Sequence, residues 1–140
     1  MDHHCLFVNN CVGSYNLKFF FLLLLYTVLG GTYNAIISYT WSQIKRPRGN
    51  DVLGFERGMV LANGVTIFVI SLILLPFVSI HIYLAATNTT TLEALKGRTK
   101  QYDLGSHMRN LKHAFGSNPW LWLSPFHSHV SDQEFLLDML

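Results

Sequence analysis

The residues best equipped for chemistry lie at the very start of this 140-residue chain. Asp2, His3, His4 and Cys5 are consecutive, and Cys11 follows shortly after. A cysteine becomes a nucleophile when a neighbouring imidazole takes its proton and a carboxylate orients that imidazole. Histidine and cysteine are also zinc ligands, and His4 with Cys11 would supply half of a tetrahedral site. The two interpretations are compatible, because different His and Cys side chains can serve each.

Two long apolar segments follow and must position this cluster. Residues 19–44 contain no ionisable side chain other than tyrosine, and residues 59–86 contain no Asp, Glu, Lys or Arg and a single histidine, His81. Each exceeds the ~20 residues that a helix needs to cross the ~30 Å apolar core of a bilayer. With 50% hydrophobic and 13% charged residues, the chain is predicted to be an α-helical integral membrane protein, with transmembrane helices at residues 19–43 and 58–86.

The tail, residues 87–140, is predicted to hold short helices and an aromatic segment. In the sequence NTTTLE a threonine can cap a helix start while Glu93 reaches back three residues, so a short helix through Leu95 should follow. Residues 106–115 are predicted to form another helix that ends at Gly116. The sequence NPWLWLSPF then places tryptophans close to the membrane, where they either lie at the bilayer interface or pack against the tail.

Three short motifs occur in order along the chain. After DHHC, five residues precede Cys11 and four more precede Asn16. Residues 90–93 read TTLE and lie directly behind the second apolar segment. Tyr102 and Asn110 then precede a Phe-Gly pair.

In this order the motifs resemble those of the DHHC family of protein S-acyltransferases, or palmitoyltransferases. Residues 1–18 would be the C-terminal part of the family's zinc-binding cysteine-rich domain, ahead of the two transmembrane helices and a small cytosolic C-terminal region. The resemblance implies supporting roles for a set of motif residues: Asn16, Thr90, Thr91, Glu93, Tyr102 and Asn110.

The resemblance also implies a division of labour at the N-terminus. Cys5 would attack the thioester of an acyl-CoA, His3 would take its proton, and Asp2 would orient His3. His4 and Cys11 would be ligands of a structural zinc ion. The acyl group, typically palmitoyl, would rest on Cys5 as a thioester and then pass to a cysteine of a protein substrate. The implied partners are acyl-CoA, proteins with membrane-proximal cysteines and the lipid bilayer, with no nucleic acid.

The sequence departs from the family pattern around the proposed nucleophile. Leu6 and Phe7 stand where the family usually has Pro-Trp, and Phe7 would still offer an aromatic wall to the acyl chain. The family's other zinc ligands and two earlier transmembrane helices would precede Asp2, so the chain resembles an N-terminally truncated member with an incomplete ligand set. Gly30 and Gly31, midway along the first span, would either pack against another helix or deepen the acyl cavity.

Two other interpretations stay open. A catalytically inactive membrane fragment, or pseudoenzyme, would lack the upstream zinc ligands. A small two-helix accessory or channel subunit would use His81 and either Asn34 or Asn63 as a polar lining, although hydrogen bonds between helices explain these residues more simply. Only the acyltransferase requires Cys5.

Charge does not orient the chain, because both the loop at residues 44–57 and the tail carry several Lys and Arg residues. Since acyl-CoA is cytosolic, the resemblance implies that both termini and the active site are cytosolic and the loop lumenal, in the membrane of the endoplasmic reticulum, Golgi or vacuole. Asp132 with Leu136 and Leu137 is similar to an acidic dileucine sorting signal, or forms a short amphipathic helix.

Overall fold

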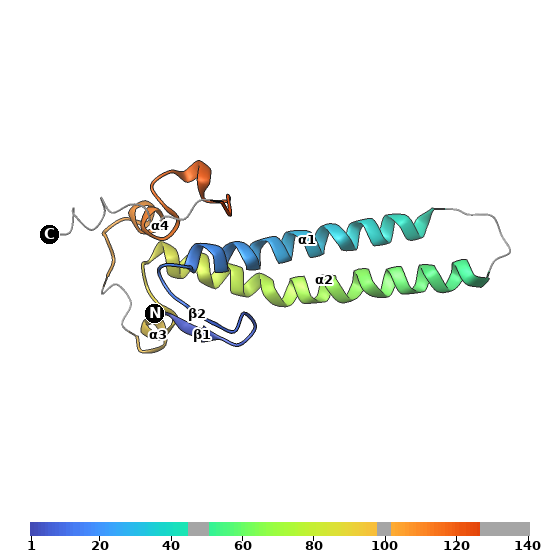
Figure 1. The fold of residues 1–140 in the computed structure, drawn as a ribbon, viewed down its shortest axis with the longest axis horizontal. Helices are drawn as coiled ribbons and strands as arrows, with labels where there is room; N and C mark the ends of the chain where they lie inside the picture. Colours follow the sequence, from blue (N-terminus) through green and yellow to red (C-terminus); the bar gives the residue numbers. More distant parts are fainter. Residues whose placement is uncertain (45–50, 98–101, 127–140) are drawn as a thin grey trace. The chain divides into compact units, whose positions relative to one another are not determined.

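The computed structural model describes residues 1–44, 51–97 and 102–126, so the dileucine sequence lies outside the described residues. The described residues form two compact units, one comprising the chain up to Leu23 and from Ser79 onward, the other Leu24–Val78. The elements, labelled in Figure 1, are β1 (His3–Cys5), β2 (Asn10–Val12), α1 (Leu17–Gln43), α2 (Asp51–Ala86), α3 (Thr91–Leu95), α4 (His107–Phe115) and a 3₁₀ turn (Pro119–Leu121).

The prediction of two long apolar helices is confirmed. Both α1 and α2 are long and apolar enough to cross a membrane, and most of their large apolar side chains are exposed. Helix α2 begins at Asp51, earlier than the predicted residue 58. Pro47 and Gly49 disfavour a helix, and the next proline is Pro76. A helix can therefore begin soon after Gly49.

Small residues line the contact between α1 and α2 in the second unit, where the two helices run antiparallel (Figure 1). Gly31 and Ser38 of α1 are buried, as are Gly64 and Ser71 of α2. A Cβ atom at Gly64 would lie 2.6 Å from Ser38 Cβ, and one at Gly31 would overlap the Ser71 hydroxyl. Small side chains let membrane helices approach closely enough for dispersion contacts to hold them together.

In the first unit, β1 and β2 form an antiparallel hairpin that leads into α1. His3 pairs with Val12, His4 with Cys11 and Cys5 with Asn10. The turn includes Asn9 at φ 47°, a left-handed conformation that asparagine tolerates better than most residues.

The core of the first unit is a small aromatic cluster between α1 and the tail. The rings of Phe21 and Phe115 meet edge to face at 5.2 Å between centroids, and Phe115 lies 5.8 Å from Trp122. Helix α4 ends at Gly116, whose φ of 105° suits glycine. This end point and the start of α4 confirm the predicted helix over residues 106–115 to within one residue.

The helix contact gives a matched pair of substitutions within α2. Gly64→Ala is expected to lower the free energy of unfolding by about 1–3 kcal/mol, because Ser38 Cβ belongs to a fixed part of its side chain and cannot rotate away. Gly58 has open space around it, so Gly58→Ala should be neutral or stabilising by up to about 1 kcal/mol. Thermal unfolding in detergent micelles measures both, and equal melting temperatures would contradict the proposed contact.

Candidate active site

The hairpin separates the polar N-terminal residues onto two faces. Side chains alternate along a strand, so His3 and Cys5 share one face of β1 while His4 points to the other. Cys5 is buried, whereas His4 and its cross-strand neighbour Cys11 are exposed. The imidazole and thiol suited to nucleophilic chemistry therefore lie on one face, and the imidazole and thiol suited to binding a metal lie on the other.

Asp2 connects this hairpin to the far end of the chain. Its carboxylate accepts a hydrogen bond from His3 Nδ1 at 2.7 Å. It also accepts the Thr91 hydroxyl at 2.9 Å and the Thr91 backbone N–H. Asp2 is 5% exposed, so these donors replace the water that a surface carboxylate would bind. The buried carboxylate is therefore fixed by Thr91 and in turn fixes the ring orientation of His3.

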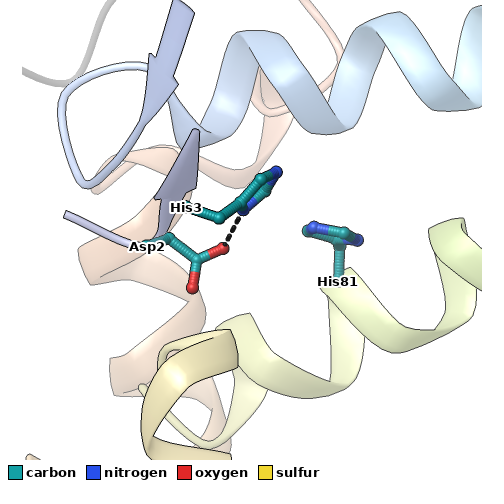
Figure 2. Close-up of side chains that lie close together, drawn as sticks. All are labelled: Asp2, His3 and His81. Carbon is teal, nitrogen blue, oxygen red and sulfur yellow. Dashed lines mark hydrogen bonds and ion pairs between the residues drawn. The ribbon is translucent and has the colours of Figure 1, made fainter. Parts of the chain in front are cut away.

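A second histidine lies beside this pair. Figure 2 shows His81 of α2 pointing toward Asp2 and His3. Each of the three residues has one atom that could bind a metal ion, and these atoms lie within 4.8 Å of one another. The His3 and His81 ring centroids are 6.1 Å apart, and both rings contact Phe20, at 5.5 and 5.1 Å. Because the Asp2 oxygens already accept three hydrogen bonds, the arrangement is better suited to orienting His3 than to binding a metal.

His4 and Cys11 have the geometry of half a zinc site. His4 Nδ1 and Cys11 Sγ are 3.6 Å apart. Zinc bonds of about 2.0 Å to nitrogen and 2.3 Å to sulfur, at a tetrahedral angle, separate two such ligands by about 3.5 Å. Both side chains are exposed, so further ligands can reach the same point.

Asn16 secures the end of the hairpin. Its side chain donates to the Cys11 carbonyl and accepts from the Gly13 N–H, both at 2.8 Å. The predicted motif asparagine thus joins the strand that carries a metal-ligand candidate to the start of α1.

The predicted helix start in the tail is confirmed in detail. The Thr90 hydroxyl accepts the Glu93 N–H at 3.2 Å, and the Glu93 carboxylate accepts the Thr90 N–H at 2.8 Å, which forms a capping box. This local bonding starts α3 and presents the Thr91 donors to Asp2.

The third motif braces the end of α2. Asn110 is fully buried and donates to the Ala86 carbonyl at 2.8 Å and to Asp103 at 2.9 Å, while it accepts the Leu104 N–H at 3.0 Å. Tyr102 contributes through its carbonyl, which accepts from Asn88 at 2.6 Å, while its side chain is 58% exposed. The tyrosine is therefore mostly exposed, unlike the asparagine.

The residues suggested for the acyl cavity belong to different units, Phe7 to the first and Gly30 and Gly31 to the second. The Phe7 side chain is fully exposed at the hairpin tip. Gly31 faces α2, where packing accounts for it, while Gly30 has open space around it. Their contribution to an acyl cavity stays a prediction.

A cavity of about 790 Å³ adjoins Asp2 and His81 and extends to Glu93 and His113. Burial lowers the pKa of the His113 imidazole, which favours its neutral form.

Comparison of the sequence with known proteins identifies the family of this chain. The sequence pattern described as DHHC palmitoyltransferase matches residues 1–98. The chain belongs to the DHHC palmitoyltransferase family. It is 37% identical over 134 residues to the probable protein S-acyltransferase 12 of Arabidopsis thaliana, covering 91% of this chain and 45% of that relative. It is 36% identical over 141 residues to the palmitoyltransferase ZDHHC15 of Rattus norvegicus, covering 94% and 41% respectively. The chain thus spans less than half the length of these relatives.

The position of His81 at this site was not predicted from the sequence, where this residue stood only as a membrane polar group of an accessory subunit. An isolated histidine in an apolar span signals a special role, but its neighbours depend on contacts between α2, β1 and α1 that no local pattern encodes. The DHHC family membership argues against the accessory subunit.

The link between Asp2 and Thr91 can be tested without measuring activity. Thr91→Val removes one of the donors to a charged group, an interaction that contributes roughly 1.5–3 kcal/mol. Amide hydrogen exchange in the hairpin should therefore accelerate about tenfold or more if the hairpin opens locally. Thr87→Val is the control, because the Thr87 hydroxyl bonds only within the end of α2, to the Tyr83 and Leu84 carbonyls. Equal exchange in the two variants would contradict the role of Thr91.

Proposed function

We propose that this chain forms the catalytic part of a protein S-acyltransferase that moves a fatty acyl group, typically palmitoyl, from acyl-CoA to cysteines of protein substrates. The observation that carries the proposal is the Asp2–His3 hydrogen bond on the hairpin face that also bears Cys5. The names of the similar proteins support the same reaction. An inactive fragment or a two-helix accessory subunit would not require this arrangement.

The proposed reaction has two steps. His3 accepts the Cys5 proton, and the thiolate attacks the acyl-CoA carbonyl carbon. The tetrahedral intermediate expels the CoA thiolate, which takes the proton from His3 and leaves the acyl group as a thioester on Cys5. A thiol of the protein substrate then gives its proton to His3 and attacks this thioester, which regenerates Cys5. Both steps exchange one thioester for another, so the reaction is close to balanced in free energy.

Asp2 serves both steps by position and charge. Its hydrogen bond holds His3 Nδ1 as a donor, so that Nε2 is the nitrogen left to accept a proton. Its negative charge stabilises the imidazolium that forms transiently. Thr91 keeps the carboxylate in place through its hydroxyl and its backbone N–H.

His4 and Cys11 are proposed as ligands of a structural zinc ion, whose remaining ligands come from outside the described residues. When bound, zinc supplies a fixed point for the hairpin and takes no part in the transfer. The alternation along β1 means that anchoring His4 also fixes the direction of His3 and Cys5.

The membrane setting follows from the two spans and the substrate. We propose that α1 and α2 cross an endomembrane, that of the endoplasmic reticulum, Golgi or vacuole, with both ends of the chain cytosolic where acyl-CoA is found. Substrate cysteines close to the bilayer can then approach Cys5, while the segment between the helices lies in the lumen.

The assignment of Cys5 and His4 to different tasks is testable on the full-length protein expressed in cells, which would supply the remaining zinc ligands. Cys5→Ser is expected to abolish the hydroxylamine-labile acyl label and to leave the zinc content unchanged. His4→Ala is expected to lose zinc and folding together. Click-labelling with an alkyne fatty acid measures the first property and metal analysis of purified protein the second. An undiminished label in Cys5→Ser would remove Cys5 as the nucleophile.

The proposed orientation predicts the fate of a glycosylation acceptor sequence. Asn88-Thr89-Thr90 fits the acceptor pattern but should remain unmodified, because it would lie on the cytosolic side. An acceptor-bearing insert after Gly49 is the positive control, since it should be glycosylated in the lumen. An endoglycosidase-sensitive shift in apparent size that disappears in Asn88→Gln would show that the orientation is the opposite of the one proposed.

A further inference from the structure

The tail segment that follows α4 is attached to the first turn of a membrane helix. Lys18 lies in the first turn of α1 and is 1% exposed, and its ammonium group donates to the Leu121 carbonyl at 2.8 Å. A lysine charge in the apolar core of a bilayer is costly, so such a residue at a helix end lies at the interface. The carbonyl that Lys18 contacts must therefore lie at interfacial depth as well.

The same segment turns its two tryptophans in different directions. Trp122 Nε1 donates to the Gly116 carbonyl at 2.8 Å, and its ring packs near Phe115. Trp120 is 92% exposed, although its backbone is fixed by a hydrogen bond from its N–H to the Asn118 side chain at 3.1 Å. The segment thus packs Trp122 against the tail and leaves Trp120 exposed.

Exposed apolar side chains continue beyond Trp120. Leu123 is 58% exposed and Phe126 is 90% exposed. The described part of this segment, residues 117–126, contains no Asp, Glu, Lys or Arg. A neutral, aromatic-rich surface next to a membrane helix matches the composition of the aromatic belt at a bilayer interface.

We propose that Trp120, Leu123 and Phe126 form an interfacial anchor that inserts into the lipid headgroup region beside the start of α1. The occupant is the bilayer because Lys18 places the segment at interfacial depth and because the surface continues from a helix that itself crosses the membrane. The anchor holds the tail against the membrane on the side of the chain that carries Cys5. This inference does not depend on acyl transfer.

Tryptophan fluorescence tests the anchor on the whole chain. The protein has three tryptophans, so Trp41→Phe with Trp122→Phe leaves Trp120 as the sole emitter, and Trp41→Phe with Trp120→Phe leaves Trp122 as the matched control. Each protein is reconstituted into phosphatidylcholine vesicles with bromine atoms on the acyl chains, placed either near the headgroup or near the bilayer centre. Aqueous iodide is the opposing quencher.

Trp120 is expected to lose more emission to the shallow bromine than to the deep bromine, to be shielded from iodide and to emit at shorter wavelength than in a water-exposed site. Trp122 should lose less emission than Trp120 to either lipid. Lys18→Met should weaken the shallow quenching of Trp120, because the attachment to Leu121 is lost. Quenching of Trp120 by iodide but not by lipid would overturn the anchor. The anchor is inferred from a fixed orientation of this segment. Equal lipid quenching of both tryptophans, or no effect of Lys18→Met, would contradict that orientation.

Discussion

The antiparallel register of the N-terminal hairpin is the constraint on which the site depends. Successive side chains of a strand face opposite ways, so the pairing of His4 with Cys11 also places His3 and Cys5 together on the other face. A slip of one residue would exchange the two faces and separate the metal-ligand pair. Asn16 helps to prevent such a slip, because its side chain bonds both the Cys11 carbonyl and the Gly13 N–H.

The tail then acts as a brace for the hairpin and the end of α2. The capping box at Thr90 starts a helix of only five residues, yet this start presents the Thr91 donors to Asp2. Asn110 cross-links the last turn of α2 to residues 103 and 104. The motif around Thr91 thus acts on the orientation of the distant His3 imidazole through Asp2, while the Asn110 motif fixes the tail to α2.

Local features of this chain could be predicted from sequence, whereas distant contacts could not. The two apolar helices, the capping box and the end of α4 at Gly116 depend on residues a few positions apart, which a sequence pattern contains. The attachment of Lys18 to Leu121 and the position of His81 depend on how separate elements pack. Tyr102 shows a further limit of sequence-based prediction. The motif predicts a supporting role for this residue, but its hydrogen bond is made by the backbone carbonyl. The early start of α2 at Asp51 was missed because apolarity marks a membrane span better than it marks a helix end.

The contact between Asp2 and Thr91 joins residues 89 positions apart, with both long helices between them. During synthesis the N-terminal hairpin is complete long before Thr91 has been made. His3 thus acquires its fixed partner only after α1 and α2 have formed and the chain beyond them has emerged. The fixed orientation of the His3 ring is consequently a late event in folding, because it depends on a residue that lies beyond both long helices.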